Sequence, residues 1–488
     1  MQLQDKDLLS IQEVRTLISE AKEAQKKLAK MNQMEIDKII DAISKVGLEK
    51  SEELAKMAAS ETGFGKWEDK VIKNVFASKM VYDYIKDLKT IGIINRNAQD
   101  ETIDIACPMG VVAGLIPSTN PTSTTIYKIM IALKGGNSII ISPHPNAKNC
   151  ILKTVEYIRE KAEQAGCPKG AIGCITIPTL QATNELMKNR DTAIILATGG
   201  EAMVRAAYSS GNPAIGVGPG NGPAYIDKSA DLKLAIKRIM DSKTFDNGTI
   251  CASEQSIVIE KCMESSVLQE LINQGAYILN DDEKAKLAKF IMRDNGTMNP
   301  QIVGKSVEKI AQLAGLTNVP TNARVLVARE TNVGFKYPYS REKLAPILAF
   351  YVEENVDCAL EKCREILLNE GSGHTFSMHC NDESIIERFA LEMPVSRVNV
   401  NTPSTLGGIG ASTKLIPALT LGCGAIGGSS TSNNIGPLDL INIKKVAKGK
   451  LELDELKNNA NLPSNNNINS SDELVSLILN KLLEELKK

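Results

Sequence analysis

The sequence lacks long apolar runs and lacks an excess of charge of either sign. No apolar stretch approaches the roughly eighteen residues that a transmembrane helix needs, so we expect no membrane span. The 57 basic and 58 acidic residues give a net charge of −1, which argues against a nucleic-acid interface and a polybasic membrane surface. The first residues lack the basic and apolar segments of a secretory signal, and we expect none.

Paired cysteines and metal-binding histidines are missing as well. The ten cysteines are scattered without a C-x-x-C pair, which excludes a disulfide scaffold and indicates free thiols in a reducing, cytoplasmic setting. The histidines are only three, His144, His374 and His379, and none has ligand spacing to cysteines or carboxylates. We therefore expect no bound zinc or iron.

What is present is typical of an α/β protein of 488 residues, 43% of them hydrophobic and 24% charged. Helical spacing of apolar residues predicts helices across 8–88, and a strand at 102–106 is expected to pair with 91–95. Strands and helices then alternate, which predicts a parallel sheet with helices on both faces and ligands at the carboxyl ends of its strands. The predicted strands are 110–116, 138–141, 174–177 and 193–197, and the predicted helices are 123–133, 146–165, 182–189 and 201–209.

Cys251 stands in a polar, glycine-containing loop that leads into the apolar segment 256–259. Loops present reactive groups, and a thiolate attacks carbonyl carbon, so Cys251 is a candidate nucleophile. A buried structural cysteine is the alternative. His374, in Gly371-Ser372-Gly373-His374-Thr375, is either a participant in deprotonating Cys251 or a structural histidine.

Four further segments are candidates for chemistry. Asn120 follows a strand in Ile116-Pro117-Ser118-Thr119-Asn120, where its amide could donate to an oxyanion or Asn-Pro could merely form a turn. Thr198-Gly199-Gly200 joins a strand to a helix, which suits a phosphate or an ordinary turn. Glu342 lies in a charged turn and could contact a ribose hydroxyl.

The fourth segment, Gly216–Gly222, is rich in glycine but is not a dinucleotide fingerprint. That fingerprint opens a helix, whereas the residues from Pro223 to Asp227 look extended. The segment is either a plain connection or a loop that makes room for a bulky ligand beside the active centre.

Taken together, these segments resemble the aldehyde dehydrogenase superfamily from about residue 8 to 447, and its CoA-acylating branch in particular, including the aldehyde dehydrogenase half of bifunctional aldehyde–alcohol dehydrogenases. The closer resemblance lies in three strings: Asp246-Asn247-Gly248-Thr249-Ile250-Cys251-Ala252-Ser253-Glu254-Gln255, Asn401-Thr402-Pro403-Ser404-Thr405-Leu406-Gly407-Gly408-Ile409-Gly410 and Leu419-Thr420-Leu421-Gly422-Cys423-Gly424.

The resemblance implies two Rossmann-like α/β domains plus a small β oligomerisation element. The expected NAD-binding domain covers 1–90 and 108–226, and the catalytic domain with Cys251 covers 227–425. The remaining expected parts are oligomerisation strands at 91–107 and 426–447, a linker at 448–469 and an amphipathic helix at 470–488.

The resemblance also implies the roles of the site residues. Cys251 would be the nucleophile, and Asn120 and the backbone N–H of Cys251 the oxyanion donors. The implied cofactor-binding residues are Thr198, Gly199, Gly200, Pro117, Glu342, Leu344, His144 and Gly218, with no metal. The implied reaction is the reversible oxidation of a short-chain aldehyde, with acetaldehyde and propionaldehyde the leading candidates, to acyl-CoA with NAD and coenzyme A.

Two departures from the hydrolytic members bear on this expectation. Those enzymes carry a Glu-Leu-Gly-Gly string whose glutamate activates water, and the matching place here is Val217-Gly218-Pro219-Gly220. The missing carboxylate favours release to coenzyme A over the rival hydrolytic activity, which would give free acid. The second departure is His144, within Ser142-Pro143-His144-Pro145, where hydrolytic members have a lysine, so the preference for NAD over NADP stays open.

The tail differs in composition from the rest of the chain. An Asn-rich stretch at 458–467 precedes an amphipathic segment at 471–487, which resembles the encapsulation peptides of bacterial microcompartment enzymes. We expect shell proteins as partners through 470–488, a homo-oligomer, and a cytoplasmic location inside a microcompartment. The alternatives are a helix that packs on its own oligomer, and a non-catalytic shell or filament component.

Overall fold

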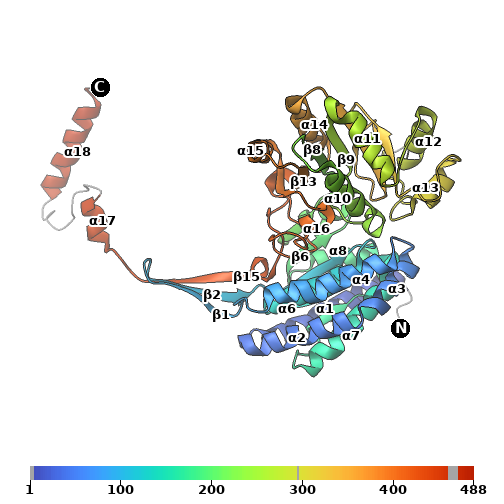
Figure 1. The fold of residues 1–488 in the computed structure, drawn as a ribbon. Coiled ribbons are helices and arrows are strands. Elements are labelled where there is room, and N and C mark those ends of the chain that lie inside the picture. The colour runs from blue at the N-terminus through green and yellow to red at the C-terminus, as the bar shows by residue number, and fades with distance from the viewer. Residues whose placement is uncertain (1–4, 294–295, 460–470, 488) are drawn as a thin grey trace. The chain divides into compact units, whose positions relative to one another are not determined.

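The computed structural model describes residues 5–293, 296–459 and 471–487. The chain divides into two units, which are described separately. The first consists of Met1–Gly92 and Ala106–Ile443, and the second of Ile93–Ile105 and Lys444–Lys488. Figure 1 shows the elements of both units in chain order.

The N-terminal segment is helical, as its apolar spacing predicts. In α2 the buried isoleucines Ile36, Ile39, Ile40 and Ile43 recur on one face, and Asn32 caps the first turn in a reciprocal bond with the residue at the third helical position. The segment consists of α1 (Lys6–Leu28), α2 (Gln33–Glu49), α3 (Ser51–Thr62), α4 (Trp67–Val75), the π-helical turn η1 (Phe76–Met80) and α5 (Val81–Ile85).

The first sheet has five strands in the order β5-β4-β3-β6-β7, and every recorded pairing in it is parallel. Its strand order reverses between β3 and β6, so the carboxyl ends of these two strands flank a crevice suited to ligands. The strands are β3 (Val111–Ile116), β4 (Ser138–Pro143), β5 (Ile172–Cys174), β6 (Thr192–Thr198) and β7 (Ala214–Val217). The turn η2 (Pro145–Ala147) and the helices α6 (Pro121–Lys134), α7 (Lys148–Gln164), α8 (Leu180–Lys188) and α9 (Glu201–Tyr208) connect them.

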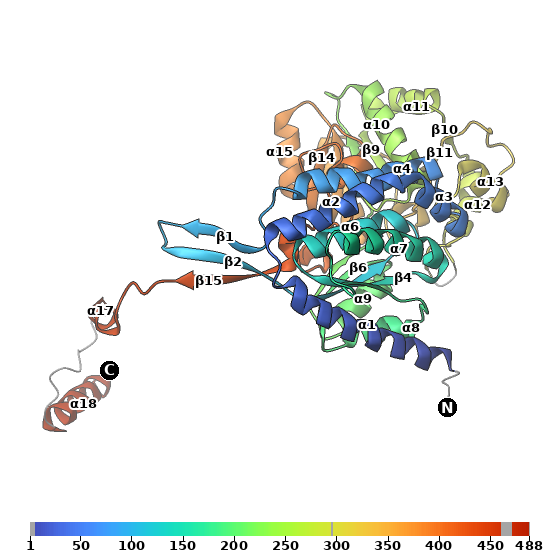
Figure 2. The ribbon, with the colours of Figure 1, turned by 90° about the horizontal axis from the view of Figure 1, so that it is seen from below.

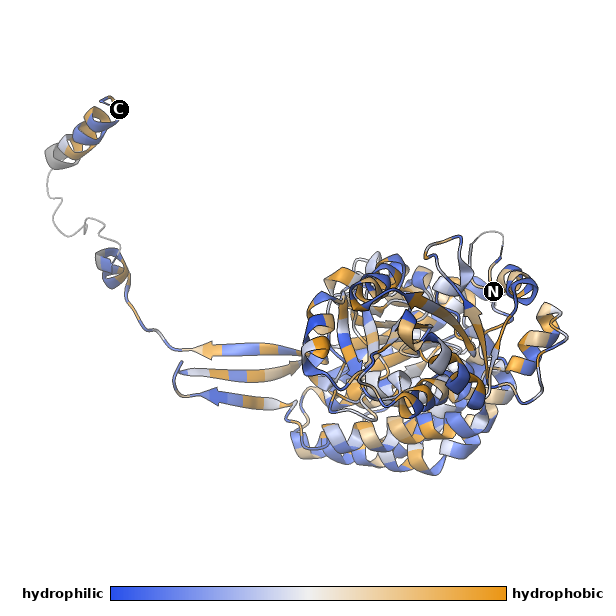
Figure 3. Ribbon diagram, turned by 45° about the horizontal axis from the view of Figure 1, so that its top comes forward, coloured by the Kyte–Doolittle hydropathy of each residue, from blue (hydrophilic) through white to orange (hydrophobic). Residues whose placement is uncertain are grey.

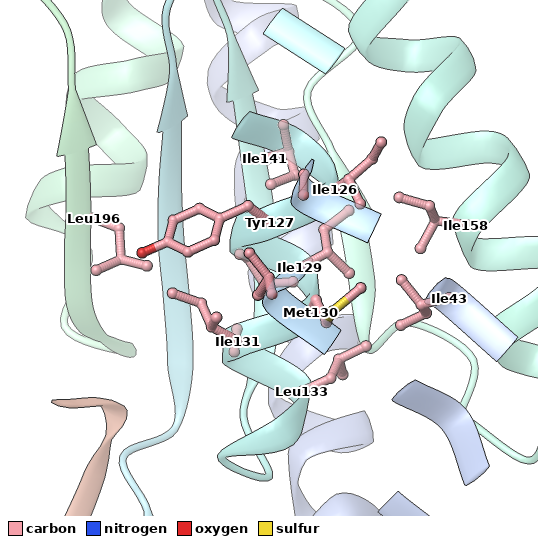
Figure 4. Close-up of a cluster of buried hydrophobic side chains, with 14 of the residues drawn as sticks. Ile43, Ile126, Tyr127, Ile129, Met130, Ile131, Leu133, Ile141, Ile158 and Leu196 are labelled. Carbon is pink, nitrogen blue, oxygen red and sulfur yellow. The ribbon is translucent and has the colours of Figure 1, made fainter. Parts of the chain in front are cut away.

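Helices cover both faces of this sheet, because alternate strand residues point to opposite sides. Helices α2, α6 and α7 pack on the face that carries Ile141 and Leu196, and Figure 4 shows α6 between these strand residues and Ile43 and Ile158 of the outer helices. Helices α1, α8 and α9 pack on the face that carries Ala113. Figure 2 shows α1, α8 and α9 together from below.

The second sheet contains seven strands, in the order β10-β11-β12-β9-β8-β13-β14, and all recorded pairings are again parallel. Helices cover this sheet on both faces too. The strands are β8 (Pro223–Ile226), β9 (Ser256–Glu260), β10 (Ala276–Ile278), β11 (Val325–Arg329), β12 (Ile347–Glu353), β13 (Gly373–His379) and β14 (Val395–Val400). The helices are α10 (Leu232–Thr244), α11 (Glu264–Asn273), α12 (Asp281–Ile291), α13 (Val307–Ala314), α14 (Val356–Asn369), α15 (Glu383–Glu392) and α16 (Ser404–Gly408), with short turns η3 (Phe245–Gly248), η4 (Lys261–Met263) and η5 (Pro338–Ser340).

The boundary between the two α/β layers lies earlier than the sequence indicates. The sequence places the break at Asp227, but β8 (Pro223–Ile226) already belongs to the second sheet. The glycine-rich segment between β7 and β8 therefore joins the two sheets, and it leads into a strand rather than a helix, which confirms that it is no dinucleotide fingerprint.

The second unit contains most of a three-stranded sheet in the order β1-β2-β15, with β1 (Gly92–Asn97), β2 (Thr102–Pro108) and β15 (Ile441–Ala447). The pairing of the first two strands is confirmed. The expected strand region from 426 is too long, because its first part contains the turns η6 (Ala425–Gly427) and η7 (Pro437–Leu440) and the strand starts at Ile441.

The tail carries two helices, α17 (Leu453–Asn459) and α18 (Ser471–Glu485). The expected linker at 448–469 thus contains a helix, and its part from 460 lies outside the described residues together with most of the Asn-rich stretch. Helix α18 agrees with the predicted amphipathic segment, and Figure 3 shows hydrophobic and hydrophilic residues interleaved along it. Within the described residues, no helix is long and apolar enough to cross a bilayer.

Candidate active site

Asn120 lies just after the carboxyl end of β3, the central strand of the first sheet. Strand β3 ends at Ile116, and the turn Pro117–Asn120 leads into α6, which begins at Pro121. Proline suits this first helical position because its missing N–H would have no partner there. The Asn120 side chain does not cap the helix; its Nδ2 donates instead to the Thr249 carbonyl oxygen at 3.0 Å, two residues before Cys251.

Thr198, Gly199 and Gly200 join β6 to α9 at the neighbouring carboxyl end. A Cβ added at Gly200 would meet nothing within 4 Å, so the backbone leaves open space at the start of the helix. The buried Oγ1 of Thr198 has no hydrogen-bond partner. A helix start with free N–H groups, open space and an unpartnered hydroxyl is suited to a phosphate.

Cys251 lies on the connection from α10 to β9, just after the turn η3 (Phe245–Gly248). Asp246 and Asn247 in that turn have positive φ angles of 48° and 52°. Residues other than glycine rarely adopt this backbone conformation. The resulting backbone strain persists only where the surrounding structure enforces it. Asp246 supplies that constraint, because its buried carboxylate accepts hydrogen bonds from Lys70, Lys73 and the backbone N–H of Lys66.

The glycine-rich connection between β7 and β8 lies directly against the cysteine loop. A Cβ at Gly220 would stand 1.8 Å from the Cys251 carbonyl oxygen, so only glycine allows this approach. The N–H of Gly220 donates to Oε1 of Glu342 at 2.9 Å. The second interpretation of this segment, a loop beside the active centre, is therefore the one that the geometry supports.

A cavity of about 300 Å³ lies among these segments. All ten residues that the sequence analysis singles out for the site line it: Cys251, Asn120, Thr198, Gly199, Gly200, Pro117, Glu342, Leu344, His144 and Gly218. Loops from both sheets thus meet around one space, with the thiol and the amide on its wall. Within the described residues, no group of three or more histidine, cysteine, aspartate or glutamate side chains could hold a metal ion.

Burial sets the protonation of the key groups. Burial, with the nearby Glu342 carboxyl next in effect, raises the pKa of the Cys251 thiol to about 12, so the thiol is protonated at neutral pH. Burial and the neighbouring Glu370 raise the pKa of Glu342 to about 8. The site therefore holds both groups neutral at pH 7, and the proton of Cys251 must leave before the sulfur can act as a nucleophile.

His374 does not share this cavity. It is fully buried on β13, its Nδ1 lies 2.9 Å from Thr375 Oγ1, and its Nε2 has no partner. Burial, followed by the charge of Arg397, lowers the pKa of His374 to about 3, so the ring is neutral. The structural interpretation of His374 is the one that this geometry favours.

Two sets of residues at the site are not predicted as site residues from the sequence, although several of them lie in the strings that carry the closer resemblance. Apolar side chains of Met298, Ile409, Leu419 and Leu421 also line the cavity. The second set is the buried trio of Lys70, Lys73 and Asp246 behind it. The i,i+3 spacing of two lysines in 70–73 was a possible signal, but it resembles that of any exposed helix.

Two parallel α/β sheets whose loops bring a cysteine and an amide into one cavity are typical of a class of enzymes that use a cysteine nucleophile. The family model described as "Aldehyde dehydrogenase family" matches residues 6–326, and the chain belongs to the aldehyde dehydrogenase family.

Three relatives illustrate the likeness. A probable aldehyde dehydrogenase from Listeria monocytogenes EGD-e is 63% identical, with a TM-score of 0.92, and the match covers 93% of this chain and 100% of that one. An acetylating aldehyde dehydrogenase from Geobacillus thermoglucosidasius is 52% identical, with a TM-score of 0.91 and coverages of 92% and 99%. The bifunctional aldehyde-alcohol dehydrogenase of Escherichia coli K12 is 44% identical over 444 residues, which are 90% of this chain but 50% of that protein. The chain thus spans about half the length of this curated relative.

More distant solved structures share the fold. A propionaldehyde dehydrogenase from Rhodopseudomonas palustris, solved with bound CoA and an acylated cysteine, is 26% identical, with a TM-score of 0.81 and coverages of 89% and 97%. A propionaldehyde dehydrogenase from the fucose utilisation microcompartment of Clostridium phytofermentans is 27% identical, with the same TM-score and coverages.

Proposed function

We propose that this protein oxidises a short-chain aldehyde to acyl-CoA, reversibly, with NAD and coenzyme A and through a thioester on Cys251. The observation that carries this proposal is the single cavity on which Cys251, Asn120 and the Thr198–Gly200 turn converge. Names among the relatives agree with it, since one is an acetylating enzyme and another was solved with CoA and an acylated cysteine.

The residues that line the cavity fit a dinucleotide. The unpartnered Thr198 hydroxyl and the open start of α9 would bind a phosphate of the cofactor. Glu342 would accept a hydrogen bond from a ribose hydroxyl. His144 and Pro117 line the same cavity, where the rest of the cofactor would lie. When bound, NAD supplies the hydride acceptor of the reaction. We propose NAD, and rates with NADP will show how strict the preference is.

The chain's own residues would carry the remaining steps. The deprotonated Sγ of Cys251 bonds to the aldehyde carbon and gives a thiohemiacetal alkoxide. The Asn120 amide and the Cys251 N–H stabilise this oxygen, and after loss of the hydride the carbonyl reforms as a thioester. The thiolate of coenzyme A then takes the acyl group, and Cys251 leaves as a thiolate.

The residues that line the cavity favour transfer of the acyl group to coenzyme A over hydrolysis of the thioester. Val217, Gly218 and Pro219 line it at the place where hydrolytic members of the superfamily carry a glutamate. The carboxylates among the described lining residues are Glu201 and Glu342, and the raised pKa of Glu342 leaves it protonated at neutral pH. Glu201 is paired with Arg205 of α9, and no carboxylate stands in the Val217–Gly220 segment, where the hydrolytic members carry theirs.

The lining also indicates the class of aldehyde. Met298, Ile409, Leu419 and Leu421 are apolar, and among the described lining residues there is no lysine or arginine. Anionic aldehydes would meet apolar surface and acidic residues, so we propose a small uncharged aldehyde such as acetaldehyde or propionaldehyde. The proposed substrate differs from the aldehydes in the names of two relatives, a succinate-semialdehyde dehydrogenase and a sulfoacetaldehyde dehydrogenase.

The test is an assay with acetaldehyde and NAD, with and without coenzyme A. We expect NADH and acyl-CoA in equal amounts only when CoA is present, and we expect Cys251→Ala to lower the rate by about 10⁴-fold or more. Cys262→Ala is the matched control, because Cys262 is exposed on a surface turn and should retain activity. Free acid formed at the same rate without CoA would instead support the hydrolytic alternative, and inactivity with every aldehyde would support a structural role.

We also propose a homo-oligomer and a place inside a bacterial microcompartment, in the cytoplasm. Exposed apolar residues on the β1-β2-β15 sheet, Ile93, Ile443 and Val446, support pairing with another copy. Exposed apolar residues on α18 support docking to shell proteins. A solved neighbour that comes from a microcompartment agrees with this location.

A further inference from the structure

Behind the cavity lies a buried charged cluster whose role the proposed reaction leaves open. Lys70 and Lys73 of α4 are each 2% exposed, and Asp246, on the cysteine loop, is fully buried. Buried charges are costly to hold, and this cluster places two cations on one carboxylate. Attachment of helix α4 alone does not explain why buried charges, with their cost in free energy, are placed beside the cavity.

The two lysines have different second partners. Lys70 Nζ donates to the backbone carbonyl of Thr119 at 3.0 Å. Lys73 Nζ donates to the side-chain oxygen Oδ1 of Asn120 at 2.5 Å and to Thr249 Oγ1 at 3.2 Å. Both therefore tie the turn after β3 to the cysteine loop, but only Lys73 has a recorded bond to the amide of Asn120.

The contact with Lys73 fixes which way the Asn120 amide faces. In the observed orientation Oδ1 accepts from a cation and Nδ2 donates to the Thr249 carbonyl oxygen. A reversed amide would direct its N–H groups at the Lys73 ammonium and its oxygen at the Thr249 carbonyl, so both contacts would become repulsive. The second N–H of Nδ2 has only a long 3.4 Å contact, to Thr119 Oγ1, and is left for a ligand in the cavity.

We propose that Lys73 is a positioning residue for the reaction, which holds the Asn120 amide with its nitrogen toward the Cys251 loop and so assembles the oxyanion site before the aldehyde arrives. The charge of Lys73 also withdraws electron density from Oδ1, which makes the opposite N–H a stronger donor. This inference rests on the proposed function, because it assigns Lys73 a task within the same reaction.

The test compares Lys73→Met with Lys70→Met. Each removes one buried cation from Asp246 and leaves the other paired with it, so both variants carry a similar electrostatic change. We expect Lys73→Met to lower kcat about 10- to 100-fold with little change in KM for the aldehyde, because it acts through a transition-state donor. Lys70→Met should have a several-fold smaller effect on kcat than Lys73→Met. The two variants should lose a similar amount of Tm.

A double-mutant cycle with Asn120→Ala separates positioning from general support of the fold. If Lys73 acts through the amide, Lys73→Met costs little further activity once Asn120 is an alanine. Equal losses of kcat in the two backgrounds, or equal losses for both lysine variants, would overturn the inference. Lys73→Gln, which keeps an N–H donor without the charge, serves in the same cycle if the methionine variant does not fold.

The wild-type measurement keeps this test apart from that of the proposed function. If the wild-type enzyme forms no acyl-CoA, the proposed function is wrong whatever the variants do. If the wild-type enzyme is active and Lys73→Met is equally active, only the role of Lys73 is wrong.

Discussion

At the scale of the residue, the site keeps the thiol of Cys251, the proposed nucleophile, protonated at neutral pH. The pKa of the Cys251 thiol is raised to about 12, first by burial and then by the Glu342 carboxyl. Far below that pKa the thiolate fraction rises about tenfold for each pH unit. A thiolate must therefore be generated during turnover, and binding of a positively charged nicotinamide ring near the sulfur would favour it.

This protonation state predicts how the enzyme without cofactor reacts with iodoacetamide. Alkylation of Cys251, followed by peptide mass spectrometry, should accelerate about 100-fold from pH 7 to pH 9 and show no plateau below pH 10. Glu342→Gln should react faster at pH 8, because it removes a carboxyl that raises the pKa of the thiol. A plateau near pH 8.5 would show that the thiol is not perturbed.

At the scale of the element, the alternation of strands and helices is predictable from the sequence, because the apolar spacing typical of each element recurs along the chain. The strands β3, β4 and β6 lie within a few residues of their predicted positions, as does helix α7. The boundary at Asp227 was misplaced because β8 looks like any short apolar strand, and its sheet depends on pairing with β9 and β13. Partners of a strand depend on distant residues, so local patterns do not reveal them.

The site shows the same division between local and distant information. Asn120, the Thr198–Gly200 turn and Cys251 were readable because each follows or precedes a strand with a recognisable turn. The bond between Lys73 and Asp246 was not, because 173 positions separate the two residues in the sequence. Neither residue alone differs from an ordinary surface charge until the fold brings them together.

The proposed docking of helix α18 on shell proteins is directly testable. Ile478 and Leu482 of this helix are four residues apart, Leu486 follows at the same spacing just after the helix ends, and all three are more than half exposed. If this face docks on shell proteins, the full chain fused to a fluorescent protein should form puncta in cells that make compartments. Ile478→Glu combined with Leu482→Glu should make the fluorescence diffuse, since charge on the apolar face opposes docking. Diffuse fluorescence of the unmodified fusion in such cells would contradict the docking proposal.

At the scale of the whole molecule, the cavity lies where connections from both sheets meet. One sheet contributes the turns after β3 and β6, and the other contributes the cysteine loop and Glu342. The fold thus places a region suited to a dinucleotide beside the Cys251 sulfur. The same arrangement gives α4 a role, because its lysines bond to loops that extend from both sheets.

The most direct test of the account is to look for the acyl group on Cys251. The enzyme is mixed with acetyl-CoA in the absence of NADH, quenched in acid and digested for mass spectrometry. We predict one acetyl group on the peptide that contains Cys251, removed by added coenzyme A and missing in Cys251→Ala. No adduct on that peptide, or an adduct that persists in the Cys251→Ala protein, would contradict the central claim.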